Sequence, residues 1–186
     1  MISTPIFPLI KTNRLELAPL LDSDAAEVFA LFSDARIVEF YDLDAFTKME
    51  EAAAWIKKHR MRFEKGEGIR WGIRHKGMSK LLGTCGFNDL TAPKESGEIG
   101  YDVSPEYWGD GIGTEAVQAI VEWGFSTGLN RPLHRIVART MLNNDASARL
   151  LEKIGFLEEG IAKQGGHWKG AFHDLRIFVL LSEKKR

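Results

Sequence analysis

The order of the predicted elements indicates the α+β class, with a mixed α/β sheet of seven strands flanked by about four helices. Two features of the chain support this class. Three strand-like runs follow one another in the middle of the sequence, as in an antiparallel meander, and strands and helices alternate after them. The length of 186 residues is enough for one hydrophobic core that buries roughly 70% of the unfolded surface. We therefore expect residues 1–186 to form a single domain.

The first part of the chain predicts one strand and two helices. Leucines alternate with other residues over residues 13–20, which is typical of a strand. Residues 22–33 have a helical apolar period, and Asp24 and Glu27 stand at the separation of a capping box. A second pair of this kind, Thr47 and Glu50, begins the next helix, which ends at the glycines of residues 65–68. One face of that helix carries Ala52, Trp55, Ile56, His59 and Phe63.

The remaining elements follow from the same patterns. Residues 69–74, 80–90 and 98–103 have a strand-like composition and are separated by turn-like segments. We expect a helix over residues 114–128, a strand over 134–140, a helix over 144–154, and a final pair of strands from residue 155 to about residue 181. The inner stripe of the first of these helices consists of Val117, Ile120, Val121 and Gly124.

Composition argues against several partners and compartments. The charges nearly cancel, with 26 acidic and 25 basic residues, so we expect neither nucleic acid nor a membrane as a partner. No apolar run approaches the ~20 residues of a bilayer-spanning helix, and Pro5 and Pro8 interrupt the apolar start, unlike a signal peptide. The single cysteine, Cys85, favours a reducing compartment, so we expect a cytoplasmic protein. The five histidines lack metal-ligand spacing, and no metal is expected.

The most informative segment is a glycine-rich turn directly before a helix. A strand ends at Val103, and glycines occupy positions 109, 111 and 113. The first turn of a helix has unpaired N–H donors and a partial positive charge, and glycines let the backbone curve closely around an anion. The pattern therefore predicts a phosphate site. A Walker loop would need Gly-Lys-Ser/Thr, and the Gly-x-Gly-x-Gly spacing differs from a dinucleotide fingerprint. A glycine turn that only begins a helix is the alternative.

Residues 107–116, Tyr-Trp-Gly-Asp-Gly-Ile-Gly-Thr-Glu-Ala, resemble the acyl-CoA pyrophosphate loop of the GNAT N-acetyltransferase superfamily. The resemblance is to the branch of ribosomal-protein alanine and serine acetyltransferases (RimJ/RimL type), and Trp108 departs from the usual Gln or Arg. Two further blocks, residues 97–104 and 144–156, stand at the expected places, and the resemblance runs from about residue 12 to residue 181. It implies the GNAT fold, whose central sheet is mixed and mostly antiparallel, and acetyl-coenzyme A (acetyl-CoA) as co-substrate.

The resemblance also implies how coenzyme A binds. Backbone groups of Tyr101 and Val103 would pair with the pantetheine amides, as an added strand would. Asn144 is the natural N-cap of its helix and would also contact the cofactor. A backbone N–H within residues 99–101 would donate to the acetyl oxygen. The turn that would hold the pyrophosphate consists of Trp108, Gly109, Asp110, Gly111, Ile112, Gly113 and Thr114.

Acetyl transfer from a thioester to an amine needs a proton donor for the leaving thiolate. Many relatives use a tyrosine, but this chain has Leu151 at the matching position. Ser147 is the predicted substitute, because it begins an inner helix stripe that continues through Leu150, Leu151 and Ile154, and an inward hydroxyl needs a partner. A serine that bonds its own backbone or helps to cap the helix is the alternative.

The amine must also lose a proton, and Glu98 is the predicted base, directly or through water. A solvated carboxylate is the alternative reading of Glu98, and three other carboxylates near the cleft stay open: Asp102, Glu106 and Asp174. Cys85 is expected to be a small buried residue rather than a covalent nucleophile. Trp71, Phe87 and Asn88 are candidates for the acceptor pocket, although alternating aromatics in strands usually belong to the core.

The resulting prediction is an acetyl-CoA-dependent N-acetyltransferase that transfers the acetyl group directly to a primary amine. An α-amine, with a reference pKa of about 8 against about 10.4 for lysine, is easier to deprotonate, which favours a protein or peptide N-terminus. A small amine such as an amino acid, a polyamine or an antibiotic is the alternative acceptor. A sensor that binds acyl-CoA without catalysis is a second alternative. Either a monomer or a homodimer is compatible with the sequence.

Overall fold

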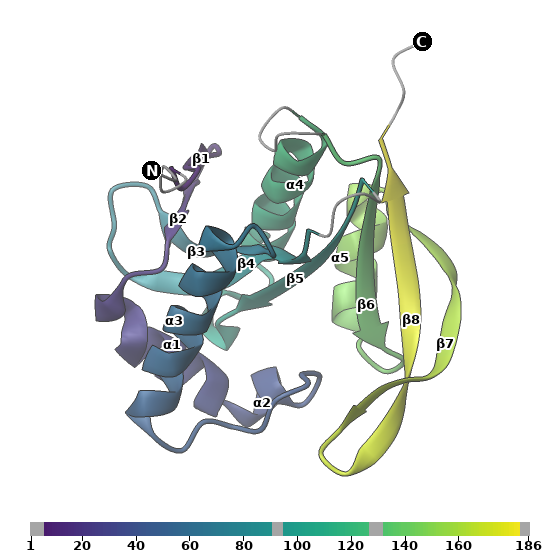
Figure 1. The fold of residues 1–186 in the computed structure, drawn as a ribbon, viewed down its shortest axis with the longest axis horizontal. Coiled ribbons are helices and arrows are strands. Elements are labelled where there is room, and N and C mark those ends of the chain that lie inside the picture. Colours follow the sequence, from purple (N-terminus) through teal and green to yellow (C-terminus); the bar gives the residue numbers. More distant parts are fainter. Residues whose placement is uncertain (1–5, 91–94, 127–131, 183–186) are drawn as a thin grey trace.

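The computed structural model describes residues 6–90, 95–126 and 132–182. Within these residues the chain forms five α-helices, two 3-10 helices and eight strands (Figure 1). The helices are η1 Asp22–Asp24, α1 Ala25–Ser33, α2 Ala35–Val38, α3 Met49–Glu64, η2 Pro105–Tyr107, α4 Ile112–Phe125 and α5 Asp145–Ile154. The strands are β1 Ile10–Lys11, β2 Leu15–Pro19, β3 Ile69–His75, β4 Leu81–Asp89, β5 Ser96–Val103, β6 Arg135–Met141, β7 Leu157–Trp168 and β8 Ala171–Leu181.

The described strands form one mixed sheet in the order β1-β2-β3-β4-β5-β6-β8-β7. Only β5 and β6 are parallel, and every other neighbouring pair is antiparallel, which confirms the mixed α/β class. The expected number of seven strands is wrong by one. The extra strand, β1, has only two residues, which pair with Leu17 and Glu16 of β2. A run of two residues is too short to show the alternation that predicts a strand.

The parallel pair opens into a V, which is the feature that positions the site. Pairing between β5 and β6 runs from Ser96↔Arg135 to Ile99↔Ala138 and then stops. Both strands keep their outer partners farther on, because Val103 still pairs with Gly83 of β4 and Met141 with Leu175 of β8. Figure 1 shows β5 and β6 diverging from this point. The facing backbone edges of residues 100–103 and 139–141 are therefore free of each other.

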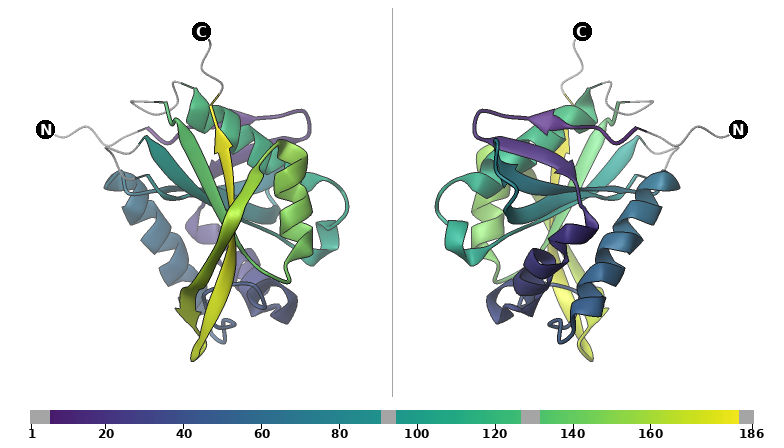
Figure 2. Two further views of the ribbon diagram at one scale, coloured as in Figure 1. Left: turned by 90° about the vertical axis from the view of Figure 1, so that its right-hand side faces the viewer. Right: turned by 90° about the vertical axis from the view of Figure 1, so that its left-hand side faces the viewer.

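Helices cover both faces of the sheet (Figure 2). Side chains alternate between the two faces of a sheet along each strand, so two neighbouring residues of β3 show which helix covers each face. Trp71 packs edge-on against Trp123 of α4, with 5.0 Å between ring centroids. Arg70, the residue before it, lies under the ring of Trp55 of α3 at 5.6 Å. The sheet thus separates an α4–α5 side from an α1–α3 side.

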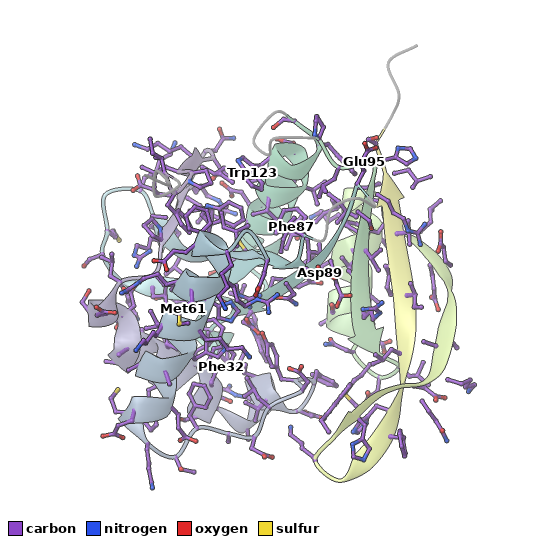
Figure 3. All side chains as sticks on the ribbon, in the orientation of Figure 1. Phe32, Met61, Phe87, Asp89, Glu95 and Trp123 are labelled. Atoms are coloured by element: carbon purple, nitrogen blue, oxygen red, sulfur yellow. The ribbon has the colours of Figure 1, made fainter. Side chains whose placement is uncertain are left out.

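Each side has its own hydrophobic cluster. On the α4 side, Phe87 lies 6.1 Å from Trp123, and a Cβ on Gly124 would stand 2.7 Å from the Phe87 ring, so this glycine lets α4 approach the sheet (Figure 3). On the other side, Phe32 of α1 packs against Trp55 at 4.9 Å. The predicted inner face of α4 is confirmed, since Val117, Ile120, Val121 and Gly124 are all buried. On the predicted face of α3, Ala52 and Ile56 are buried, and Trp55, His59 and Phe63 are half-buried.

Two of the predicted helix caps are wrong in detail. Asp24 accepts from the Leu21 N–H at 2.7 Å and from Arg74 at 2.5 Å, so it closes the 3-10 turn instead of pairing with Glu27. At the start of α3, Glu51 rather than Glu50 accepts from the backbone N–H groups of residues 47 and 48 at 2.7 and 2.8 Å. The short helix α2 was not expected, since four residues show no period. The predicted end of α4, at Gly128, lies outside the described residues.

Among the described residues, no helix combines the length and the apolar character needed to cross a membrane.

Candidate active site

A groove with a volume of about 1480 Å³ runs through the opening between β5 and β6. Its walls come from the unpaired halves of these strands, from the start of α4, from α5, from α3 and the segment before it, and from the β7–β8 hairpin. At the open end, the Lys169 ammonium in the hairpin donates to the Val38 carbonyl of α2 at 2.5 Å. Pockets for one small ligand are usually about 300–1,000 Å³, so the groove has room for two substrates.

The glycine turn lies at the β5 end of the groove. Gly109 and Gly111 have φ of +88° and +76°, a region that other residues rarely adopt. Gly111 is the N-cap of α4, and the N–H groups of the first turn have no partner inside the helix. Since no side chain caps this end, the donors are available to an anion. Most of the predicted turn lines the groove: Trp108, Gly109, Gly111, Ile112, Gly113 and Thr114.

The turn is braced from outside the groove by the start of β2. Glu115, in the first turn of α4, accepts from Thr12 Oγ1 at 2.5 Å and from the Arg14 backbone N–H and Nε at 2.9 and 2.7 Å. Arg14 also donates to the carbonyl of Asp110 at 3.0 Å. Partial burial raises the pKa of Glu115, but the bonds from Thr12 and Arg14 outweigh it and lower the pKa below its ordinary value. The acid next to the predicted phosphate site is therefore neutralised by its own partners.

Asp110 and Trp108 differ from the other residues of the turn in their contacts. Asp110 does not line the groove, and its backbone carbonyl is held by Arg14. The Trp108 indole donates to the Val103 carbonyl at 2.7 Å, and the Arg36 guanidinium lies 5.9 Å from the centre of its ring. The Val103 carbonyl is thus already bonded. The next N–H along the chain, that of Ser104, donates to the Leu82 carbonyl of β4 at 2.8 Å, so the Val103 N–H points away from β4, toward the groove. Trp108 fixes the path of the chain from β5 into the turn.

Ser147 faces the groove from the first turn of α5. Its backbone N–H donates to Asn144 Oδ1 at 3.1 Å, so Asn144 is the N-cap that the sequence predicts. The Ser147 hydroxyl does not bond the helix backbone, and it lies 2.6 Å from the hydroxyl of Tyr101 on β5. Leu151, by contrast, is fully buried in the core. The hydroxyl of Ser147 therefore stands between α5 and β5 at the wall of the groove.

One polar atom on the opposite wall has no partner within the described chain. The Oγ1 atom of Thr140, on the free edge of β6, is buried and makes no hydrogen bond. Buried hydroxyls are nearly always bonded, and this atom is too enclosed for a ligand to reach it from the groove without a shift of its neighbours. The free backbone edges of β5 and β6 carry donors and acceptors that match the amide groups of a pantetheine chain. These residues fit coenzyme A.

Glu98 lines the groove just before the point where β5 and β6 separate. Its carboxylate is ion-paired with Arg139 across the parallel pair, and it remains partly exposed. The register of β4 against β5 shifts here, between Phe87 and Asp89, so the bulge lies on β4 at Asn88 rather than on β5. An amine that approaches Glu98 competes with the Arg139 guanidinium for the same carboxylate.

Asp102 is a buried carboxylate on the α3 side of the groove. Its Oδ2 accepts from Arg70, from Thr84 at 3.0 Å and from Tyr41 at 3.3 Å. Burial raises the pKa of Asp102 above its ordinary value, against the effect of Arg70, Thr84 and Tyr41. Burial likewise raises the pKa of Tyr41, which remains a neutral phenol. This network forms a polar floor beneath the aromatic lining of Phe40, Tyr41, Phe46, Trp55 and Trp168.

Most of the other candidates lie away from the groove. Glu106 pairs with Lys80 at 3.1 Å, and Asp174 pairs with Lys163 at 2.7 Å; neither lines the groove. Cys85 is fully buried, and burial raises its pKa to about 12, so the thiol cannot serve as a nucleophile. Trp71 and Phe87 are core residues, with 0% and 2% of their surface exposed, and Asn88 alone of the three lines the groove. In the described part of the chain, no cluster of three metal-ligating residues occurs.

Sequence patterns missed two parts of this site. Tyr101 is named above only for its backbone, because a tyrosine in a strand usually reads as a packing residue. The contact between its hydroxyl and Ser147 joins residues 46 positions apart and has no local pattern. The network of Arg70, Asp102 and Tyr41 was missed as well. The signal that could have revealed it is a single charged residue between apolar or aromatic neighbours in each of two strands, Arg70 in β3 and Asp102 in β5.

A family model described as an acetyltransferase (GNAT) domain matches residues 14–157. The match covers more than half of the chain, and the chain belongs to the GNAT acetyltransferase family. Proteins of this family use acetyl-CoA.

The uncharacterised N-acetyltransferase YoaA of Bacillus subtilis is 34% identical over 180 residues, covering 97% of this chain and 100% of YoaA. The ribosomal-protein-serine acetyltransferase of Escherichia coli is 26% identical over 106 residues, 57% of this chain and 58% of that protein. A structure of RimL, a ribosomal L7/L12 α-N-protein acetyltransferase in complex with coenzyme A, has a TM-score of 0.82 at 21% identity, covering 94% of this chain and 98% of that chain. The protein is an N-acetyltransferase, and its relatives include a ribosomal-protein-serine acetyltransferase.

Proposed function

We propose that residues 1–186 act as one domain that transfers the acetyl group of acetyl-CoA directly to the α-amine of a protein or peptide. The observation that supports this most strongly is the groove between the free edges of β5 and β6, with positive-φ glycines and an uncapped helix N-terminus at one end. An extended pantetheine chain can add to a strand edge, and a diphosphate can accept bonds from the helix N-terminus.

In this proposal, the residues that bind coenzyme A come from β5, the glycine turn and α5. The backbone of Tyr101 and Val103 holds the pantetheine, the N–H groups of residues 109–114 hold the diphosphate, and Asn144 contacts the cofactor. When bound, acetyl-CoA supplies an acetyl group activated as a thioester. Charge-assisted hydrogen bonds of the kind formed by the turn contribute about 1.5–3 kcal/mol each. Arg149 and Lys153 of α5 line the same groove and add positive charge beside the phosphates.

The chain's own residues would handle the two protons of the reaction. Glu98, whose carboxylate is ion-paired with Arg139, takes the proton of the amine directly or through water. Asp102 is the alternative base, because it lines the groove and its pKa is raised by burial. Ser147 gives a proton to the thiolate as the carbon–sulfur bond breaks, and a backbone N–H of residues 99–101 stabilises the carbonyl oxygen.

The acceptor would enter from the opposite side of the groove, between α3 and the β7–β8 hairpin. This half is lined by aromatic rings over a polar floor, and it lies across the sheet opening from the glycine turn. The ribosomal-protein acetyltransferases among the relatives support a protein N-terminus as the acceptor. A small amine remains the second candidate acceptor, because the aromatic lining would bind it equally well.

The test is steady-state release of free thiol from acetyl-CoA, with mass spectrometry of the products, on peptides that begin with Ala or Ser and on a matched panel of small amines. We expect the peptides to be acetylated at their first amine. Acetylation of small amines alone would assign the enzyme to that acceptor class. Tight binding of coenzyme A without turnover on any acceptor would contradict the enzymatic proposal and favour a sensor.

The role of Ser147 is tested by Ser147→Ala. Because a positioned proton donor typically contributes 10²–10⁴-fold, we expect kcat to fall about 100-fold while the Kd of acetyl-CoA, measured by calorimetry, changes less than about threefold. An unchanged kcat would remove Ser147 from the mechanism.

A further inference from the structure

We propose that Tyr101 is a positioning residue that holds the Ser147 hydroxyl so that its hydrogen points into the groove. This inference rests on the proposed function and extends it to a side chain on β5. The observation that carries it is the 2.6 Å contact between the hydroxyl oxygens of Tyr101 and Ser147, at the place where both residues line the groove.

The direction of this hydrogen bond follows from acidity. A phenol, with a reference pKa of about 10, is a far stronger acid than an aliphatic hydroxyl and is the better donor. Burial raises the pKa of Tyr101 further, so the phenol keeps its hydrogen at neutral pH. The carbonyl of Ser147 lies 3.4 Å from the same phenol oxygen, too far to compete with a contact of 2.6 Å. Tyr101 therefore donates and Ser147 Oγ accepts.

A serine that accepts from Tyr101 has its own hydrogen free. The helix backbone does not take it, because Ser147 Oγ makes no bond to the residues one turn before it, and Asn144 already caps this end through the Ser147 N–H. The free hydrogen is then available to the sulfur atom of a leaving thiolate. As the carbon–sulfur bond breaks, this hydrogen moves to sulfur, and the Tyr101 hydrogen bond stabilises the developing charge on Ser147 Oγ.

The proton inventory closes without a further reagent. The amine gives one proton to the base and through it to water, and water returns one proton to Ser147. The Tyr101 phenol keeps its hydrogen throughout, so the side chain acts through Ser147 and does not touch the substrate. The chain lacks a tyrosine at position 151, and the fold instead brings a phenol to α5 from the neighbouring strand, packed among the core residues of the α4–α5 side.

A double-mutant cycle tests the inference in the full chain, with Tyr101→Phe, Ser147→Ala and the double variant. Tyr101→Phe removes one oxygen, and we expect kcat to fall about 10-fold with KM for acetyl-CoA within about twofold. In the Ser147→Ala background, the same change should alter kcat less than about twofold, because the hydroxyl that Tyr101 positions is gone. Ser182→Ala, which removes a hydroxyl that lies 3.3 Å from His134 Nδ1 and outside the groove, is the control and should leave kcat unchanged.

Equal losses from Tyr101→Phe in both backgrounds would overturn the inference and leave the proposed function in place. A wild-type protein without turnover on any acceptor would overturn both. Should Tyr101→Phe lose its fold, the hydrogen bond is read directly by incorporating 3-fluorotyrosine and recording ¹⁹F spectra, with single Tyr→Phe changes for assignment. We expect the Tyr101 resonance to move on Ser147→Ala. A resonance that stays in place would overturn the inference.

Discussion

The positive φ of Gly111 shapes the turn that we propose binds an anion. Its φ of +76° turns the chain into α4, and it exposes the first N–H groups of that helix to the groove. A Cβ at this position would stand 3.5 Å from Arg14 Nη2, so space is available and the cost of a substitution lies in the angle. Asn adopts positive φ more readily than most residues, and it is nearly the size of Asp. The two substitutions therefore separate strain from charge.

We predict that Gly111→Asp weakens binding of acetyl-CoA much more than Gly111→Asn does. The carboxylate would repel the diphosphate and take up its N–H donors, at a cost of about 1.5–3 kcal/mol or more, which is roughly a 10- to 100-fold loss of affinity. Calorimetry of both variants measures the difference. Equal affinities for Asp and Asn at this position would mean that no phosphate lies at the turn.

At the scale of single residues, sequence reasoning succeeded where chemistry depends on residue type alone. The glycines of the turn, the cap at Asn144 and the inward serine of α5 lie where the pattern places them. It failed for contacts that only the folded sheet creates. The partner of the Ser147 hydroxyl is on a different element, and the ion pair of Glu98 joins two strands.

At the scale of elements, the caps of α5 help to position Ser147 in the site. Asn144 Oδ1 accepts from the Ser147 N–H at 3.1 Å, and Gly155, in the left-handed region at φ +105°, ends the helix. Only Ala148 and Leu151 of this helix are fully buried, so its ends depend on these caps. A cap of this kind also fixes the backbone that carries Ser147.

We predict that Asn144→Ala lowers the free energy of unfolding by about 1 kcal/mol, because the first turn of α5 loses its side-chain acceptor. Asn144→Ser keeps an acceptor at the same position and should lie within a few tenths of a kcal/mol of the wild type. Urea unfolding at neutral pH measures both. If the serine variant were as unstable as the alanine variant, the side chain of Asn144 would not act as a cap.

The element boundaries show why some local signals mislead. Glu50 and Glu51 are neighbours, and the pattern chose the first because it stands three residues after a threonine. The helix instead starts one residue later, and Glu51 reaches both preceding N–H groups. Composition cannot distinguish Glu50 from Glu51, because the position at which α3 starts depends on the packing of Ala52 and Ile56 in the core.

The whole molecule is arranged around the opening between β5 and β6. Pattern analysis predicted the meander, the crossovers and the order of the elements, since these depend on periodicity. It did not predict the V itself, because strands that separate have the same alternation as strands that pair. The acceptor half of the groove also escaped, since it combines α3, the segment before it and a distant hairpin.

His59 lies in this acceptor half, and its lowered pKa affects the stability of the whole fold. It lies on α3 against Trp55, 4.2 Å between ring centroids, and lines the groove. Burial first, and then the positive charges of Arg70, Lys58 and Arg62, lower its pKa from 6.5 to about 3. The folded protein therefore holds His59 neutral, whereas the unfolded chain takes up a proton below pH 6.5.

We predict that stability falls as the pH drops below the unfolded value of 6.5 toward the folded value of about 3. Because the depressed pKa favours unfolding in acid, this residue should account for about 1–2 kcal/mol of the loss between neutral pH and about pH 5. Urea unfolding at several pH values measures it. His59→Gln should flatten the acid slope. Parallel slopes for wild type and His59→Gln would contradict the prediction.

The most direct test of the account is a crystal structure of the protein with coenzyme A. We predict that the diphosphate accepts hydrogen bonds from the N–H groups of residues 109–114, and that the pantetheine lies between residues 100–103 of β5 and 139–141 of β6, with its sulfur beside Ser147. Coenzyme A bound elsewhere on the protein, with the glycine turn in contact with none of its phosphates, would contradict the account.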